Sequence, residues 1–180
     1  ELTLDMRHVS QDLHLFIGYS EQPMPTESSA PTPAAPAGAP MSLEDARRLG
    51  FARVEQLAGN IGYLDLRFFA GSVDVAAAAA TVMSELASTD AVIVDLRQNT
   101  GGAPYGGTVI MSYFFGEEPV LLYDFYDRND QLMSSASTLR EVAGPRLADK
   151  ELYVLTSHLT ISGGEAFAYT FVDSNNKTFV

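Results

Sequence analysis

Apolar residues recur along the chain with two different periods. Residues 51–57 and 61–69 flank the turn sequence AGN and predict a β-hairpin. In the second arm Ile61, Tyr63 and Asp65 alternate with smaller or more apolar neighbours, which indicates that one face is better buried. Residues 42–48 open with a serine and carry two acidic residues in the first turn, which predicts a helix start.

The remainder alternates between strand-like and helix-like segments. Further strands are expected over 91–96, 120–126 and 151–156, and helices over 72–88, 106–115 and 163–173. The run AVIVDL at 91–96 is almost wholly apolar, which is typical of a strand covered on both faces. Residues 127–150 are polar and favour no element. The alternation predicts an α/β fold with a mixed, largely parallel sheet and flanking helices.

The N-terminal part differs in composition from the rest. Residues 13–19, LHLFIGY, favour a strand, whereas residues 21–41 are rich in Pro, Ala, Ser and Thr and predict a mobile or extended loop. We therefore divide the chain into a strand segment over 1–20 that contributes to the main domain, a flexible loop over 21–41 and a core over 42–180. The missing initiator Met, and a closing NNKTFV in which a new apolar run begins, lead us to expect a piece of a longer protein, truncated at its C-terminal end.

Composition excludes several classes of function. The chain has 180 residues, 46% of them hydrophobic, which suits one domain with a sizeable core. A formal net charge of −12 argues against binding nucleic acid or anionic lipid. No cysteine is present, so disulfides, Cys-ligated zinc and thiol nucleophiles are excluded. No apolar run is long enough for a membrane span.

Two glycine-rich segments follow predicted strands. DLRQNTGG ends the strand at 91–96, and TSHLTISGG follows the strand at 151–156. If the two strands are neighbours, both loops meet at the carboxyl edge of the sheet and bring Ser162 beside backbone N–H groups and a helix N-terminus. That arrangement suits the oxyanion of acyl transfer. The residues alone equally allow Ser162 to be a helix cap, completed by Glu165, and NTGG to be a plain turn.

Three ordered blocks carry a resemblance to a known family. IGYLDLRFF, AVIVDLRQNTGG and VLTSHLTISGGEAFAY resemble the S41 peptidases, which include C-terminal processing proteases, the tricorn core protease and the modules of interphotoreceptor retinoid-binding protein. Ala166 departs from the pattern, where a second Glu is common. The resemblance implies a ClpP/crotonase-like fold with Ser162 as nucleophile. It also implies that Gly163 donates an oxyanion N–H, helped by Gly101 or Gly102.

The general base has two candidates under this resemblance. In the C-terminal processing branch it is a lysine roughly two dozen residues after the serine, which falls beyond Val180; Lys177 comes too early and resembles a helix-end position. In the tricorn-like branch it is a histidine from an N-terminal segment. QDLHL resembles that segment, so His14 is our candidate base, with Asp12 orienting the segment or capping a turn. The plain alternative is a histidine at a strand edge, facing water.

Other conspicuous residues have structural interpretations. We expect His8 in a solvated helix, and His158 at a position that is variable in the family. Asp95 and Arg97 are expected to hold the glycine loop, and Glu165 to cap a helix. Aromatic side chains near the loops are expected in the core: Tyr105, Tyr113, Phe115, Phe167 and Tyr169.

The sequence thus predicts a serine peptidase that forms an acyl-enzyme on Ser162, with no metal or organic cofactor. The expected partners are a peptide or protein substrate and, through an unpaired strand edge near Phe179, a second copy of the chain. No segment suggests a PDZ domain. An exported or periplasmic location in bacteria follows from the family resemblance alone. The rival is a non-catalytic module of the same fold that binds a hydrophobic, retinoid- or lipid-like ligand; it needs an apolar cavity but no base beside Ser162.

Overall fold

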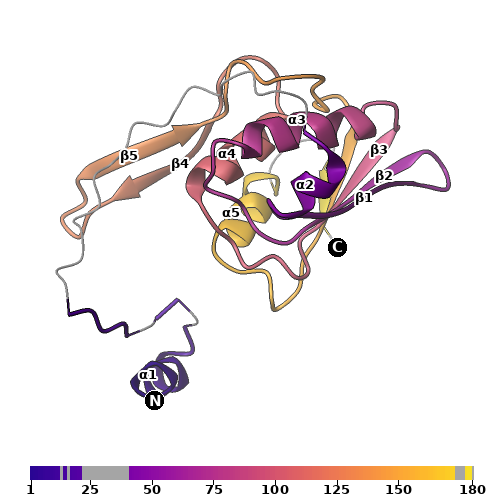
Figure 1. Cartoon of the computed structure of the whole chain (residues 1–180). Helices are drawn as coiled ribbons and strands as arrows, with labels where there is room; N and C mark the ends of the chain where they lie inside the picture. The colour runs from indigo at the N-terminus through magenta and orange to yellow at the C-terminus, as the bar shows by residue number, and fades with distance from the viewer. Residues whose placement is uncertain (13, 16, 22–40, 173–176, 180) are drawn as a thin grey trace. The chain divides into compact units, whose positions relative to one another are not determined.

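The structure is a computed structural model that describes residues 1–12, 14–15, 17–21, 41–172 and 177–179 (Figure 1). The chain divides into two compact units, residues 1–32 and 33–180. Most of the loop expected over 21–41 lies outside the described residues. Among the described residues, no helix has both the length and the apolar character needed to cross a membrane.

A five-stranded sheet forms the centre of the larger unit. Its order is β1-β2-β3-β6-β7, and every neighbouring pair is parallel except the antiparallel pair β1–β2. The strands are β1 (Phe51–Leu57), β2 (Ile61–Leu66), β3 (Ala91–Asp95), β6 (Glu151–Leu155) and β7 (Lys177–Phe179). The predicted hairpin and the largely parallel sheet are confirmed. Lys177, expected at a helix end, instead begins the edge strand β7.

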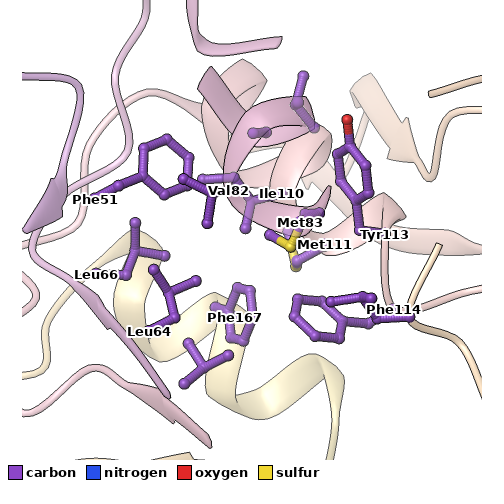
Figure 2. Close-up of a cluster of buried hydrophobic side chains, with 14 of the residues drawn as sticks. Phe51, Leu64, Leu66, Val82, Met83, Ile110, Met111, Tyr113, Phe114 and Phe167 are labelled. Atoms are coloured by element: carbon purple, nitrogen blue, oxygen red, sulfur yellow. The ribbon is translucent and has the colours of Figure 1, made fainter. Parts of the chain in front are cut away.

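Helices cover one face of this sheet and enclose the core. They are α2 (Leu43–Arg47), α3 (Val75–Leu86), α4 (Pro104–Ser112) and α5 (Gly163–Thr170). Leu64 and Leu66 of β2 pack in one cluster with Val82, Ile110 and Phe167 from three helices (Figure 2). Burial of such side chains is the main source of stability, at about 1.5–3 kcal/mol for each large one.

The opposite face of the sheet is less covered than the sequence suggests. Val92 and Val94 of β3 are fully buried, but Ile93, which points the other way, is only half-buried. Tyr63 and Tyr153 flank it in register on β2 and β6 and are also half-buried. The prediction of a strand covered on both faces is therefore wrong for this face, because β-branched residues fit a half-exposed pleat as well as a buried one.

Helix starts follow the local chemistry. The hydroxyl of Ser42 accepts a hydrogen bond from the Asp45 N–H at 3.1 Å, which caps α2 as predicted. The helix expected over 106–115 begins two residues earlier, because Pro104 occupies its first turn, where a missing N–H costs nothing. The helix expected over 72–88 is confirmed as α3.

A separate two-stranded sheet joins β4 (Leu121–Tyr126) to β5 (Leu132–Ser137) in antiparallel fashion. The strand expected over 120–126 is confirmed, but it lies outside the parallel sheet. Its partner β5 falls in the polar segment for which the sequence favoured no element. The connecting turn is held by the Asp127 carboxylate, which accepts the N–H groups of Asn129 and Gln131 at 2.7 and 2.9 Å.

Two polar side chains fasten the segment that follows β5. The Arg146 guanidinium donates to four backbone carbonyls, including those of Phe115 at 3.1 Å and Leu139 at 2.8 Å. The buried Tyr113 hydroxyl donates to the carbonyl of Ala143 at 2.8 Å. Burial raises the pKa of Tyr113 to about 12, although the nearby Arg146 charge opposes the shift.

The smaller unit contains α1 (Leu2–Ser10) and the turn that follows it. His8 lies exposed on this helix, as expected. The predicted strand over 13–19 is wrong for its described residues, 14–15 and 17–19, none of which is in a strand. Their backbone groups bond to helix side chains instead of a neighbouring strand: the Ile17 N–H donates to the Thr3 hydroxyl at 2.9 Å, and Arg7 donates to the Leu15 carbonyl at 2.8 Å.

Candidate active site

The two glycine-rich loops meet at the carboxyl edge of the sheet, because β3 and β6 are adjacent and parallel. The Ile161 N–H donates to the Asn99 carbonyl at 3.2 Å, and the buried Thr160 hydroxyl donates to the Leu96 carbonyl at 2.7 Å. Ser157 adds a hydrogen bond from its hydroxyl to the Arg97 carbonyl at 2.5 Å. These bonds fix the loop that precedes α5 against the loop that follows β3.

Asn99 is the polar centre of this contact, and sequence analysis missed it. Its side chain is fully buried; the amide group donates to the Leu66 carbonyl at 2.9 Å, and Oδ1 accepts the Gly101 N–H at 2.8 Å. Asn99 thereby joins the end of β2 to the glycine loop. The available signal was an Asn two residues before a glycine, the spacing of a side-chain turn.

Glycine is required where the loops touch. Gly101 has φ +82°, and a Cβ there would lie 2.7 Å from Ser162 Cβ. Gly102 has φ +138°, and a Cβ there would lie 2.3 Å from the Phe69 carbonyl oxygen. No side chain fits at either place, so the glycines allow the backbone to approach Ser162 closely.

Ser162 itself has an unusual backbone conformation. Its φ of 55° and ψ of −120° belong to a region in which residues other than glycine are strained. The Glu165 carboxylate accepts the Ser162 N–H at 2.6 Å and helps hold this conformation. The capping role expected for Glu165 is therefore observed. Strain of this kind typically accumulates at functional sites, including the serine turns between a strand and a helix in hydrolases.

The backbone N–H groups near Ser162 differ in whether they already donate a hydrogen bond. The Gly163 N–H lies in the first turn of α5, where helices leave N–H groups without an internal partner. Within the described part of the chain, neither this group nor the Gly102 N–H donates a hydrogen bond. The Gly101 N–H, by contrast, is occupied by Asn99. Two N–H groups near Ser162 are thus available to an anionic oxygen.

Asp95 and Arg97 stabilise the start of the glycine loop. The Asp95 carboxylate accepts from the Arg97 guanidinium at 2.6 and 3.0 Å, from the Arg97 N–H at 3.0 Å and from the Tyr63 hydroxyl at 2.6 Å. Burial works to raise the pKa of Asp95, but the hydrogen bonds from Arg97 and Tyr63 outweigh it and lower the pKa to about 2. This arrangement agrees with the expected structural role.

The candidate base His14 lies in the smaller unit, paired with a carboxylate. Asp12 Oδ1 accepts the His14 backbone N–H at 2.9 Å and lies 2.8 Å from His14 Nδ1. Hydrogen bonds from the His14 backbone and ring lower the pKa of Asp12. The pairing occupies Nδ1, so Nε2 is the ring nitrogen left for a further hydrogen bond. In the larger unit, His158 lies exposed in the loop before Ser162.

An apolar hollow of about 590 Å³ adjoins Ser162, within the size range of ligand sites. Its lining comes from the loops, α4, α5 and β4, and includes Phe69, Met111, Leu122 and Phe125. The prediction that Tyr169 lies in the core is wrong, because its side chain is 81% exposed and lines the hollow. The other predicted core aromatics are buried or packed against the core: Tyr105, Tyr113, Phe115 and Phe167. In the part of the chain that the structure describes, no three acidic or histidine side chains gather as metal ligands would.

Solved structures with the same fold include several proteases. The photosystem II D1 C-terminal processing protease is 22% identical, with a TM-score of 0.54, over 69% of this chain and 32% of that protein. A candidate peptidase from Parabacteroides merdae is 23% identical, with a TM-score of 0.57, over 70% of this chain and 41% of that protein. A lipoprotein from Streptococcus agalactiae is 15% identical, with a TM-score of 0.54, over 77% of this chain and 52% of that protein.

The chain therefore spans between about a third and about half of the length of these proteins. A sequence model of peptidase family S41 matches residues 60–180, which contain both glycine-rich loops and Ser162. The match covers more than half of the chain, and the sheet flanked by helices agrees with it. The chain belongs to peptidase family S41.

Proposed function

We propose that this chain carries the nucleophile of a serine peptidase and that the nucleophile is Ser162. The observation that supports this most strongly is the strained backbone of Ser162 at the first turn of α5. A helix cap does not require such a conformation, since Ser42 caps α2 with an ordinary extended backbone, φ −75° and ψ 154°. The difference between the two serines favours a role beyond capping for Ser162.

In the proposed reaction, the Ser162 hydroxyl attacks the carbonyl carbon of a peptide bond while a base removes its proton. The carbonyl oxygen becomes an oxyanion that accepts hydrogen bonds from the Gly163 and Gly102 N–H groups. The proton then passes to the departing amine and leaves an acyl group on Ser162. Water hydrolyses this ester and regenerates the hydroxyl.

His14 is the base that we propose. Asp12 holds His14 Nδ1, so Nε2 is left to take the proton from Ser162 and to return it to the amine. A general base acts within about 2.6–3.2 Å of the hydroxyl whose proton it takes, so replacement of His14 should abolish this proton transfer.

A second function is favoured by one observation, the apolar hollow. A module that only carries a hydrophobic ligand would use the hollow and have no need for the strained serine. Two results together would favour the binding module: a fluorescent fatty acid binds the Ser162→Ala variant with wild-type affinity, and the wild type hydrolyses no peptide.

Hydrolysis of a mixed peptide library, followed by mass spectrometry, tests the peptidase proposal. We expect cleavage by the wild type and a loss of at least about 10³-fold in Ser162→Ala. His14→Ala should lose activity comparably, whereas His158→Ala should not. Wild-type activity retained in Ser162→Ala would refute the assignment of the nucleophile; retained activity in His14→Ala would refute only the assignment of the base.

A further inference from the structure

The hollow beside Ser162 contains a glycine that neither the backbone nor the packing requires. Gly107 is buried within α4 and has no left-handed φ. A Cβ at this position would lie 3.6 Å from Met111 Cε and 4.0 Å from Phe69 Cδ1, which are ordinary contacts. Glycine inside a helix is less stable than alanine, so its presence here calls for another cause.

Its neighbour in the same helix shows the contrast. A Cβ at Gly106 would lie 2.3 Å from the Ala70 carbonyl oxygen, so close packing of α4 requires glycine there. At Gly107 the nearest side chains, Met111 and Phe69, both line the hollow. A side chain at this position would therefore occupy space that is now part of the hollow.

The chemistry of the lining restricts what can enter. Leu122 and Phe125 of β4 add apolar side chains to the lining that α4 and α5 supply. Glu165 is the one charged residue in the described lining, and its carboxylate faces the Ser162 N–H. An acidic group would be repelled by this carboxylate, and any charged group would lose hydration among apolar side chains.

We infer that the hollow binds a large apolar side chain of the substrate and that Gly107 is a determinant of this specificity because it keeps the hollow open. The inference rests on the proposed peptidase function. Since Ser162, Gly163 and Gly102 also line the hollow, the side chain belongs to the residue whose carbonyl carbon Ser162 attacks. Phe, Leu and Met are preferred at this position over Ala, and Asp and Glu are disfavoured.

The test compares kcat/KM for peptides that differ only at this residue, Phe against Ala. We expect the wild type to prefer Phe by roughly 10- to 100-fold. Gly107→Ala should lower the Phe-to-Ala ratio by at least about fivefold, and Gly107→Leu should abolish the preference. Gly116→Ala is the matched control: a Cβ there meets nothing within 4 Å, the site is outside the hollow, and the ratio should not change. Unfolding midpoints establish that each variant is folded.

Failure of this inference can be told apart from failure of the proposed function. Cleavage with no preference for large apolar residues, or a preference that survives Gly107→Leu, would overturn the inference and leave the peptidase proposal intact. If the wild type cleaves no peptide, the peptidase proposal fails. Binding of acetylated peptides that end in Phe or Ala, followed by amide NMR shifts, then tests whether the hollow takes a large apolar side chain: equal dissociation constants overturn the inference entirely. At least tenfold tighter binding of the Phe peptide, lost in Gly107→Leu, supports only the part that concerns the hollow and Gly107.

Discussion

Replacing Asn99 by alanine should destabilise the fold and the site together. The change removes the donor to the Leu66 carbonyl and the acceptor of the Gly101 N–H, both of which belong to buried residues. Leaving a buried backbone group without a partner costs about 1–3 kcal/mol, so two such groups cost about 2–6 kcal/mol. For a domain of this size that loss corresponds to a fall in Tm on the order of 10 °C.

Chemical denaturation followed by circular dichroism measures this effect. Gln98→Ala is the matched control, since Gln98 is exposed and, among the described residues, its side chain bonds to Arg67 alone; we expect a change within about 0.5 kcal/mol. At temperatures where Asn99→Ala is folded, it should also react more slowly with a serine-directed phosphonate, because the glycine loop loses its anchor. A free energy of unfolding for Asn99→Ala equal to that of Gln98→Ala would refute the role given to Asn99.

Three further predictions follow from the structure. Because hydrogen bonds from Arg97 hold the pKa of Asp95 at about 2, below its unfolded value of about 3.9, this carboxylate contributes stability above pH 4 that is lost as the pH falls towards 2. In Asp95→Asn the free energy of unfolding should therefore change less steeply with pH in that window. An unchanged slope would contradict the ion pair. Burial raises the pKa of Tyr113 to about 12, above the unfolded value of about 10, so its contribution to stability is complete below pH 10 and is lost between pH 10 and 12. In Tyr113→Phe the free energy of unfolding should therefore fall less steeply across that range. A fall as steep as in the wild type would show that another group governs it. Arg146→Lys should lower the free energy of unfolding by about 2 kcal/mol, because an ammonium cannot reach all four carbonyls that the guanidinium binds. Urea unfolding measures this loss, and a loss below about 0.5 kcal/mol would count against the role given to Arg146.

The parts of the fold that the sequence predicted are those with strong local signals. The AGN turn, the helical spacing of Val82 and Leu86 and the Ser42 cap each depend on residues close in the chain. The strands β3 and β6 were predicted from short apolar runs, and the alternation of elements then indicated their parallel pairing.

The errors have a common physical origin in tertiary contacts. Residues 13–19 have strand-forming side chains, but the Ile17 backbone bonds to Thr3 instead of a neighbouring strand. β5 is polar because it has a single neighbour and an exposed face, so its sequence lacks an apolar run. Tyr169 lies on the face of α5 that borders the hollow, and helical spacing could not indicate this without the position of β4.

The candidate site was predicted in part. The proximity of the two glycine loops followed from the rule that carboxyl ends of neighbouring parallel strands meet, and the structure places Ile161 against Asn99 accordingly. The buried role of Asn99 and the hollow beside Ser162 could not be predicted, because both depend on segments far apart in the sequence. Which glycine N–H is free depended on one side-chain hydrogen bond, from Gly101 to Asn99.

The most direct test of the central claim is fluorophosphonate labelling of the chain over 1–180, with intact mass and peptide mapping. An activated serine phosphonylates at its own oxygen, so we predict one adduct, located on Ser162 and absent from Ser162→Ala. Slower labelling of His14→Ala would support His14 as the base. The absence of any adduct on the folded wild-type chain, or an adduct that persists in Ser162→Ala, would contradict the claim that Ser162 is the nucleophile.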